Sequence, residues 1–223
     1  MKRISAEALW QNADASKALP YIKKFDMPFD ALSHIADMIA DISKELDKDK
    51  YNVIADCVWV AKSASIAPTA TIIGPCIIGE DTEVRPGAFI RGNVIVGKKA
   101  VVGNSTELKN CILFDGVQVP HFNYVGDSIL GYKAHMGAGA VTSNVKSDKT
   151  LVTIKLEGEK IETGRKKFGA LLGDFVEVGC NSVLNPGTVI GKGTNVYPLS
   201  SVRGYVPQNS IYKSENIIVE KVR

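Results

Sequence analysis

The stretch IIGPCIIGEDTEVRPGAFIRGNVIVG, residues 72–97, places a large aliphatic residue at every sixth position. The same phase holds for eleven consecutive positions, here called anchors, and a second run of six anchors follows later in the chain. The first run is Ile54, Val60, Ile66, Ile72, Ile78, Val84, Ile90, Val96, Val102, Leu108 and Phe114; the second is Leu172, Val178, Leu184, Ile190, Val196 and Val202. If about 0.3 of residues are large and apolar, chance produces the longer run about once in a million trials per phase. The chain therefore contains a true six-residue repeat.

This repeat excludes an α-helix, because six residues advance a helix by about 1.67 turns and would spread the anchors around it. A short strand followed by a corner does repeat its inward side chain every six residues. Three such sides make a coil of about 18 residues, and backbone pairing stacks the coils about 4.8 Å apart. The sequence thus predicts a mainly β protein, a parallel β-helix whose interior the anchors fill.

The composition of the 223 residues agrees with such a prism: Gly 20 and Pro 9 suit its corners, and aromatic residues reach only 7%. A net charge of +3 is too small to indicate a nucleic-acid partner. No apolar run approaches the roughly 18 residues of a membrane span, and MKRISAEALWQN at the start lacks the apolar stretch of a secretory signal. We therefore expect a cytoplasmic protein with no membrane partner. Its four cysteines form no CxxC pair, so we expect reduced structural thiols.

Residues 1–50 differ from the repeat and predict an N-terminal helical appendage. Asp30 can cap a helix in which apolar residues alternate by three and four. These apolar residues are Leu32, Ile35, Ile39, Ile42 and Leu46. Such a stripe must be buried, and we expect it to close the open end of the β-helix or to contact a neighbouring subunit.

Residues 51–206 form the predicted β-helix domain, which a projecting hairpin interrupts at about 147–165. Within this hairpin, apolar and polar residues alternate up to the turn residues Glu157-Gly158. Residues 207–223 make a C-terminal tail, in which the apolar group 217–219 predicts one last strand.

The repeat breaks after Phe114, because the next position in phase is Pro120. An apolar period resumes at Val119 and slips by one residue twice before Met136. The disturbed stretch contains His121, and the slip can turn its imidazole outward. Histidine is the side chain best suited to take a proton near neutral pH, although a histidine in a loop is more often simply solvated.

Cations gather near this break. Arg85, Arg91 and Lys109 directly follow anchors and project at successive heights of the prism. Others flank the hairpin, namely Lys146, Lys149, Arg165, Lys166 and Lys167. A phosphate group is a natural counter-ion for such a face, and a solvated basic surface is the alternative.

Five stretches in order carry a resemblance to a known family. They are VRPGAF (84–89), ELKN (107–110), PHFNYVGD (120–127), MGAGAVTSN (136–144) and GRKKFGALLGDFVEVG (164–179). Together they resemble the acetyltransferase half of the bifunctional glucosamine-1-phosphate N-acetyltransferase/N-acetylglucosamine-1-phosphate uridyltransferases, which implies a left-handed β-helix. The hairpin and GRKKFGA look most like the archaeal-type sugar-1-phosphate nucleotidylyltransferase/acetyltransferases. No Gly-rich start of the type GxGTR…PK precedes the β-helix, so we expect the nucleotidyltransferase half to be absent.

The resemblance implies a role for each matching residue. His121 looks like the general base, and it stands three residues before Tyr124 as the HxxY pattern of the family requires. Tyr124 matches a residue that lines the sugar. The cations that match the phosphate-binding residues of the family are Arg85, Lys109 and Lys167.

Further matches concern the sugar and the thioester. Asn144 matches an asparagine near both substrates, and Ala138 and Cys180 match positions that meet acetyl-coenzyme A (acetyl-CoA). His135 stands where the bacterial enzymes have a sugar-binding asparagine, and Val145 replaces a tyrosine. Because of these two departures, glucosamine 1-phosphate and galactosamine 1-phosphate both remain candidate substrates.

The resemblance therefore implies an acetyl-CoA-dependent N-acetyltransferase that acts on an amino-sugar 1-phosphate and feeds UDP-N-acetyl-sugar synthesis. His121 would remove the amine proton during attack on the thioester, and backbone N–H groups of residues 137–139 would stabilise the anionic intermediate. No metal is required for this step. The resemblance also implies a homotrimer with coenzyme A between subunits, and a separate nucleotidyltransferase is a candidate partner.

Two other functions remain open. The fold also permits a non-catalytic binding or regulatory subunit of a sugar-nucleotide enzyme, because a fold does not dictate an activity. A zinc hydratase of the γ-class carbonic anhydrase kind needs three converging histidines. The chain has three, but His34 lies in the appendage and His121 and His135 are fourteen residues apart, which disfavours this hypothesis.

Overall fold

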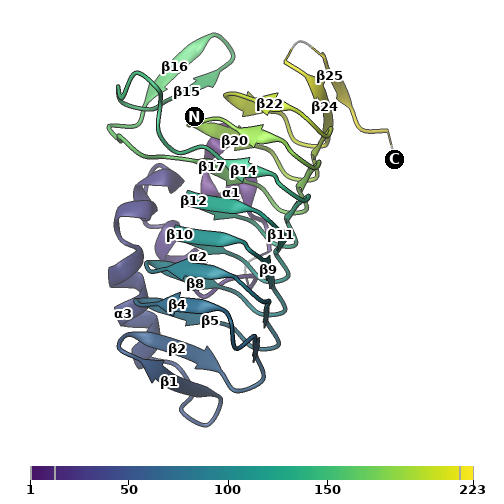
Figure 1. Ribbon diagram of the computed structural model, residues 1–223. Coiled ribbons are helices and arrows are strands. Elements are labelled where there is room, and N and C mark those ends of the chain that lie inside the picture. The colour runs from purple at the N-terminus through teal and green to yellow at the C-terminus, as the bar shows by residue number, and fades with distance from the viewer. Residues whose placement is uncertain (1, 13, 216, 223) are drawn as a thin grey trace.

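The strands of the protein are short because each forms one side of a three-sided coil. The computed structural model describes residues 2–12, 14–215 and 217–222. It shows coils stacked into a solenoid of about nine turns, with most neighbouring strands paired in parallel (Figure 1). The predicted left-handed parallel β-helix is therefore confirmed.

The first side of the prism, here called the covered face, lies under the N-terminal segment. Its strands are β2 (Val58–Ala61), β5 (Cys76–Ile78), β8 (Val94–Val96), the second halves of β10 (Glu107–Leu113) and β12 (Tyr124–Leu130), β17 (Ala170–Leu172), β20 (Thr188–Ile190) and β23 (Tyr205–Val206). β1 (Tyr51–Ala55) pairs antiparallel with β2 and precedes the first coil.

Among the described residues, no helix lies on the other two sides. The open face consists of β4 (Thr71–Ile73), β7 (Phe89–Arg91), the first halves of β10 and β12, β14 (Val141–Thr142), β19 (Val183–Leu184) and β22 (Ser201–Val202). The third face consists of β3 (Ser65–Ile66), β6 (Glu83–Val84), β9 (Val101–Asn104), β11 (Gln118–His121), β13 (His135–Met136), β18 (Glu177–Val178), β21 (Asn195–Val196), β24 (Ser210–Ser214) and β25 (Ile217–Glu220).

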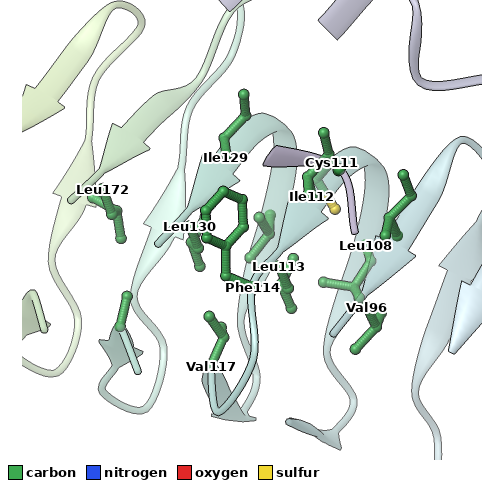
Figure 2. Packing of buried hydrophobic residues seen from close by; sticks show 14 of the residues in the cluster. Val96, Leu108, Cys111, Ile112, Leu113, Phe114, Val117, Ile129, Leu130 and Leu172 are labelled. Carbon is green, nitrogen blue, oxygen red and sulfur yellow. The ribbon is translucent and has the colours of Figure 1, made fainter. Parts of the chain in front are cut away.

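Anchors of successive coils stack on one another and fill the interior. Leu113 pairs with Val96 on one side and Leu130 on the other, and Leu130 pairs with Leu172 (Figure 2). Leu113 is thus the anchor, and the assignment of Phe114 to this role was wrong. Phe114 is buried instead against the indole of Trp10 in the N-terminal segment, with ring centroids 5.3 Å apart. Ile54 is also not an anchor: its side chain is 53% exposed because β1 lies outside the coils.

The two slips of the repeat have a geometric cause. β10 and β12 each run continuously from the open face to the covered face, so the corner between these faces contains one residue fewer than the corner between β7 and β8. Asn110 and Asp127 turn these tight corners alone, with φ of 49° and 48°. The first slip therefore falls between Leu108 and Leu113, not after Phe114, and the second falls between Val125 and Leu130.

The N-terminal segment lies along the side of the solenoid (Figure 1). Its helices are η1 (Lys2–Ile4), α1 (Ala6–Leu9), α2 (Leu19–Ile22), η2 (Pro28–Ser33) and α3 (Ile35–Lys44). α3 packs on β5, β8 and β10, and η2 packs on β12, so the segment covers a face and does not close the end. Asp30 is not the cap, because it lies within η2 and His34 precedes α3. The predicted stripe from Leu32 to Leu46 is buried.

The hairpin and the tail lie at the C-terminal end of the solenoid (Figure 1). β15 (Thr153–Leu156) pairs antiparallel with β16 (Glu159–Glu162) around the turn at Glu157 and Gly158, as the alternation predicts. In the tail, β25 adds antiparallel to β24. No helix in the described ranges is long and apolar enough to cross a membrane.

Candidate active site

His121 stands at the corner between the third face and the open face. It ends β11, and three residues later Tyr124 begins β12 on the adjoining side of the prism. The imidazole is exposed and forms no hydrogen bond with the described part of the chain. An exposed, unpaired imidazole at a convex corner is free to meet a substrate amine.

Asn123 fixes the backbone of this corner. Its side chain is 2% exposed; the amide donates to the carbonyl oxygens of Gly137 (2.8 Å) and Ala140 (3.0 Å), and its oxygen accepts from the His121 N–H (3.1 Å). The corner of one coil is thereby attached to the next. The equivalent place in the neighbouring coils holds the smaller residues Thr106 and Ala140, a comparison that requires the register of the strands.

Ala138 and Cys180 lie at successive heights of the same corner as His121. The Gly139 N–H donates to the His121 carbonyl (3.0 Å), and the Asn181 N–H donates to the Ala138 carbonyl (2.8 Å). Three residues assigned by the resemblance to the base and to acetyl-CoA therefore form one column along an edge of the prism.

Tyr124 lies across the open face. A Cβ built on Gly126 would come within 2.5 Å of the Tyr124 hydroxyl, so only glycine leaves room for the ring there. The hydroxyl receives a hydrogen bond from the Asn144 amide at 3.3 Å. Burial raises the pKa of Tyr124, and the negative charge of Asp127 adds to this shift. The phenol therefore stays neutral and can donate to a sugar hydroxyl.

Asp127, which the sequence did not single out, holds Asn144 in place. Its carboxylate is buried, with the residue 5% exposed, and it accepts from the Asn144 amide (2.5 Å) and from the Asn110 amide (2.9 Å). Arg165 lies nearby, and its Nη1 donates to Ser33 Oγ (2.8 Å). A fixed amide such as that of Asn144 can recognise a polar ligand group without a loss of rotamer freedom.

Cations border this cluster on the open face. Lys109 follows the anchor Leu108 on β10 and pairs in register with Gly126. One coil earlier, Arg91 ends β7 in the equivalent position and donates to Glu107 Oε1 (2.6 Å). Lys167 is exposed and precedes Phe168, whose N–H donates to the Asn144 carbonyl (2.9 Å). The sequence-predicted residues Lys109 and Lys167 thus border Tyr124 and Asn144.

Two predicted site residues lie elsewhere in the single chain. Arg85 follows β6 of the third face and donates to Glu83 Oε2 (3.0 Å). His135 is also on the third face, with Nδ1 2.7 Å from Glu177 Oε2. Arg91, which the role assignment omitted, takes the place expected of Arg85 beside Lys109.

A family model described as the GMPPB C-terminal domain matches residues 72–189, which is more than half of the chain. The chain belongs to this family. The matched region of the GMPPB C-terminal domain includes His121, Tyr124, Asn144 and Cys180.

Two curated bifunctional proteins are similar to this chain in sequence. The bifunctional sugar-1-phosphate nucleotidylyltransferase/acetyltransferase of Sulfurisphaera tokodaii is 33% identical over 186 residues, which cover 75% of this chain and 46% of that protein. The bifunctional protein GlmU of Methanococcus vannielii is 34% identical over 139 residues, or 62% of this chain and 33% of that protein. The chain thus spans less than half the length of these curated relatives. Among solved structures, the acetyltransferase domain of PglB from Neisseria gonorrhoeae has a TM-score of 0.38 and 16% identity, covering 73% of this chain and 57% of that one.

Proposed function

We propose that this chain is an acetyl-CoA-dependent N-acetyltransferase that acts on an amino-sugar 1-phosphate. The observation that carries the proposal is the corner at His121. Tyr124 and Asn144 lie on one side of it, and Ala138 and Cys180 continue the corner along the edge. A nucleophile held on the open face and a thioester laid along the edge would therefore meet at His121.

The residues divide the reaction between them. The His121 imidazole removes the proton from the substrate amine as the nitrogen attacks the thioester carbonyl, and the thiolate leaves. Arg91, Lys109 and Lys167 hold the phosphate, so that binding energy from this remote group orients the amine. Tyr124 and Asn144 hydrogen-bond the sugar. The amino sugar is either glucosamine or galactosamine, because His135 and Val145 depart from the pattern of the bacterial enzymes.

Of the backbone N–H groups at residues 137–139, we assign one as the hydrogen-bond donor to the oxyanion. The Gly137 N–H is already used on the Val178 carbonyl (2.7 Å), and the Gly139 N–H on the His121 carbonyl (3.0 Å). The Ala138 N–H donates to no backbone carbonyl in the described ranges. It lies between these two in the column next to His121, where the anionic intermediate forms.

We also propose a homotrimer in the cytoplasm, with coenzyme A between neighbouring subunits. Two exposed apolar side chains on the His121 edge, Phe122 (62% exposed) and Leu199 (80% exposed), support a partner there. A separate nucleotidyltransferase would consume the product, a reaction for which the bifunctional relatives are named.

The proposal is tested by mixing the protein with acetyl-CoA and either glucosamine 1-phosphate or galactosamine 1-phosphate and following free thiol. We expect thiol release with at least one sugar. Replacing His121 with Ala should lower kcat by about 10²–10⁴, the usual worth of a general base. Replacing exposed His34 with Ala is the matched control and should leave kcat unchanged.

The alternative, a binding or regulatory subunit, predicts no thiol release with either sugar. Full activity in the His121→Ala variant would overturn the mechanism while leaving the acetyltransferase assignment intact.

A further inference from the structure

A pocket of about 450 Å³ lies between the hairpin and the open face, near the C-terminal end of the solenoid. On the hairpin it is lined by Thr153, Lys155 and Lys160. On the prism it is lined by Ser143, Val145, Lys146, Ser147, Asn185, Pro186, Arg203 and Gly204. These residues include four cations and no carboxylate. The pocket is therefore strongly electropositive.

Three of the four cations have no counter-ion in the described ranges. Lys146 is paired with Asp148 Oδ2 at 3.5 Å, whereas Lys155, Lys160 and Arg203 form no ion pair among the described residues. Glu162 shares the outer side of the hairpin, opposite Thr153, but it does not line the pocket.

Two of these cations oppose each other directly. Lys155 on β15 and Lys160 on β16 are cross-strand partners in the antiparallel hairpin. Like charges directly opposite each other destabilise a sheet, whereas an opposite-charge pair stabilises it. An anion between the two ammonium groups would remove this repulsion.

The pocket is preformed because the hairpin is seated rigidly on the prism. Val152 and Ile154 are fully buried, and Leu156 is 5% exposed, so the alternate residues Thr153 and Lys155 face outward. Glycines at two corners allow the close approach: a Cβ on Gly187 would lie 2.6 Å from the Thr153 carbonyl, and one on Gly204 would lie 2.7 Å from the Lys155 carbonyl.

We propose that this pocket binds a phosphate or diphosphate group, at a site separate from Arg91 and Lys109. Lysine and arginine are the usual ligands of phosphate oxygens, and the side chains of Ser143, Thr153 and Asn185 supply neutral hydrogen-bond partners. Ser143 and Val145 flank Asn144 in the chain, so the pocket adjoins the candidate active site. A ligand with its reactive end at Asn144 can place a phosphate here.

Two sources of the phosphate fit this position. One is the 3′-phosphate of coenzyme A, and the other is the diphosphate of a nucleotide-linked sugar. The site itself does not depend on the proposed function, because binding is measured without turnover. Only the choice between the two ligands rests on that function.

The experiment measures the affinities of coenzyme A, 3′-dephospho-coenzyme A and UDP by calorimetry at constant ionic strength. The variant is the double replacement Lys155→Gln, Lys160→Gln, and the matched control is Lys62→Gln, an exposed lysine in the first coil. We expect the double variant to bind coenzyme A or UDP at least about tenfold more weakly, the loss typical of charge-assisted hydrogen bonds. The control should stay within twofold.

The three probes identify the source. A loss seen with coenzyme A and absent with the dephospho form assigns the pocket to the 3′-phosphate, and a loss with UDP assigns it to a nucleoside diphosphate. Unchanged affinity for all three probes, or an equal loss in Lys62→Gln, overturns the proposal. If binding persists but no thiol is released in the assay above, the proposed activity fails and the phosphate site stands.

A second variant separates binding from folding. Lys160→Glu replaces a like-charge pair with an opposite-charge pair, so it should raise the thermal midpoint slightly while it abolishes phosphate binding. A fall in both quantities would show that the lysine supports the hairpin itself, which contradicts the proposal.

Discussion

Arg85 and Arg91 are six residues apart in the chain, and this places them on different faces of the prism. Arg91 and Lys109 are eighteen residues apart, which is one full coil, so their side chains leave the same face one above the other. The period alone thus distinguishes the two arginines. The family resemblance points to Arg85, whereas the register places Arg91 beside Lys109.

We expect Arg91→Gln to raise KM for the sugar phosphate about tenfold with little change in kcat, because a charge-assisted hydrogen bond to the phosphate is lost. Arg85→Gln is the matched control and should change KM less than twofold, since Arg85 pairs with Glu83 on another face. Steady-state kinetics of thiol release measure both. If Arg85→Gln raised KM more than Arg91→Gln, the phosphate would bind on the third face instead.

Other residues of the site could not be predicted from a period. Asn123 and Asp127 act through hydrogen bonds to carbonyls and amides of adjacent coils, and these partners are known only once the slips are placed. Asp127 has its function because the shortened corner turns its side chain beneath Asn144. A shift of one residue in the repeat changes which side chains meet between coils. The anchors alone locate this shift only to within several residues.

At the scale of elements, the N-terminal segment and the covered face define each other. The strands of this face carry apolar residues at their outward middle positions, which on an uncovered side would meet water. These residues are Ile77, Ile95, Ile112, Ile129, Leu171 and Val189, and all are buried. They recur with the period of one coil and so indicate which side a covering element occupies. The apolar stripe from Leu32 to Leu46 predicted that it would be buried, but it did not indicate which part of the solenoid it would cover.

Replacing Ile112 with Ala should therefore destabilise the protein by about 2–5 kcal/mol, the usual cost of an emptied core position. Ile73→Ala is the matched control: Ile73 is outward on a strand of the open face and is 50% exposed, so the cost should stay within about 0.5 kcal/mol. Urea unfolding of both variants gives the comparison. Equal costs would mean that the N-terminal segment does not cover the solenoid in solution.

At the scale of the whole molecule, the fold could be predicted because every coil repeats an inward-facing apolar side chain, so the pattern is seen many times in one sequence. Errors in single coils, such as Phe114 for Leu113, do not change the architecture. Contacts outside the repeat occur only once and cannot be checked against other coils. Contacts between subunits are of this kind. The evidence for them lies in one column of the corner that contains His121.

This column holds residues with positive φ in successive coils. Its members are Gly87, Ser105, Phe122, Gly139, Asn181 and Leu199. Glycine and asparagine tolerate the left-handed conformation, whereas for leucine it costs roughly 1 kcal/mol. Leu199 nevertheless adopts it with φ of 59° and exposes 80% of its surface. Its backbone N–H donates to the Cys180 carbonyl (2.9 Å), but its side chain is left largely in solvent, so we expect this side chain to contact a neighbouring subunit.

Leu199→Asn should therefore act in opposite directions on the chain and on the assembly. The single chain should become slightly more stable, because asparagine suits the left-handed backbone. The proposed trimer of about 72 kDa, from chains of 24.0 kDa, should dissociate at protein concentrations at which the unmodified protein is still assembled. Leu151→Asn, at a 43% exposed leucine beside the hairpin, is the control and should leave the trimer intact. Sedimentation across a concentration series separates the two effects. A trimer that Leu199→Asn leaves unchanged would place the interface elsewhere, and a fully active monomer would show that each chain carries a complete site.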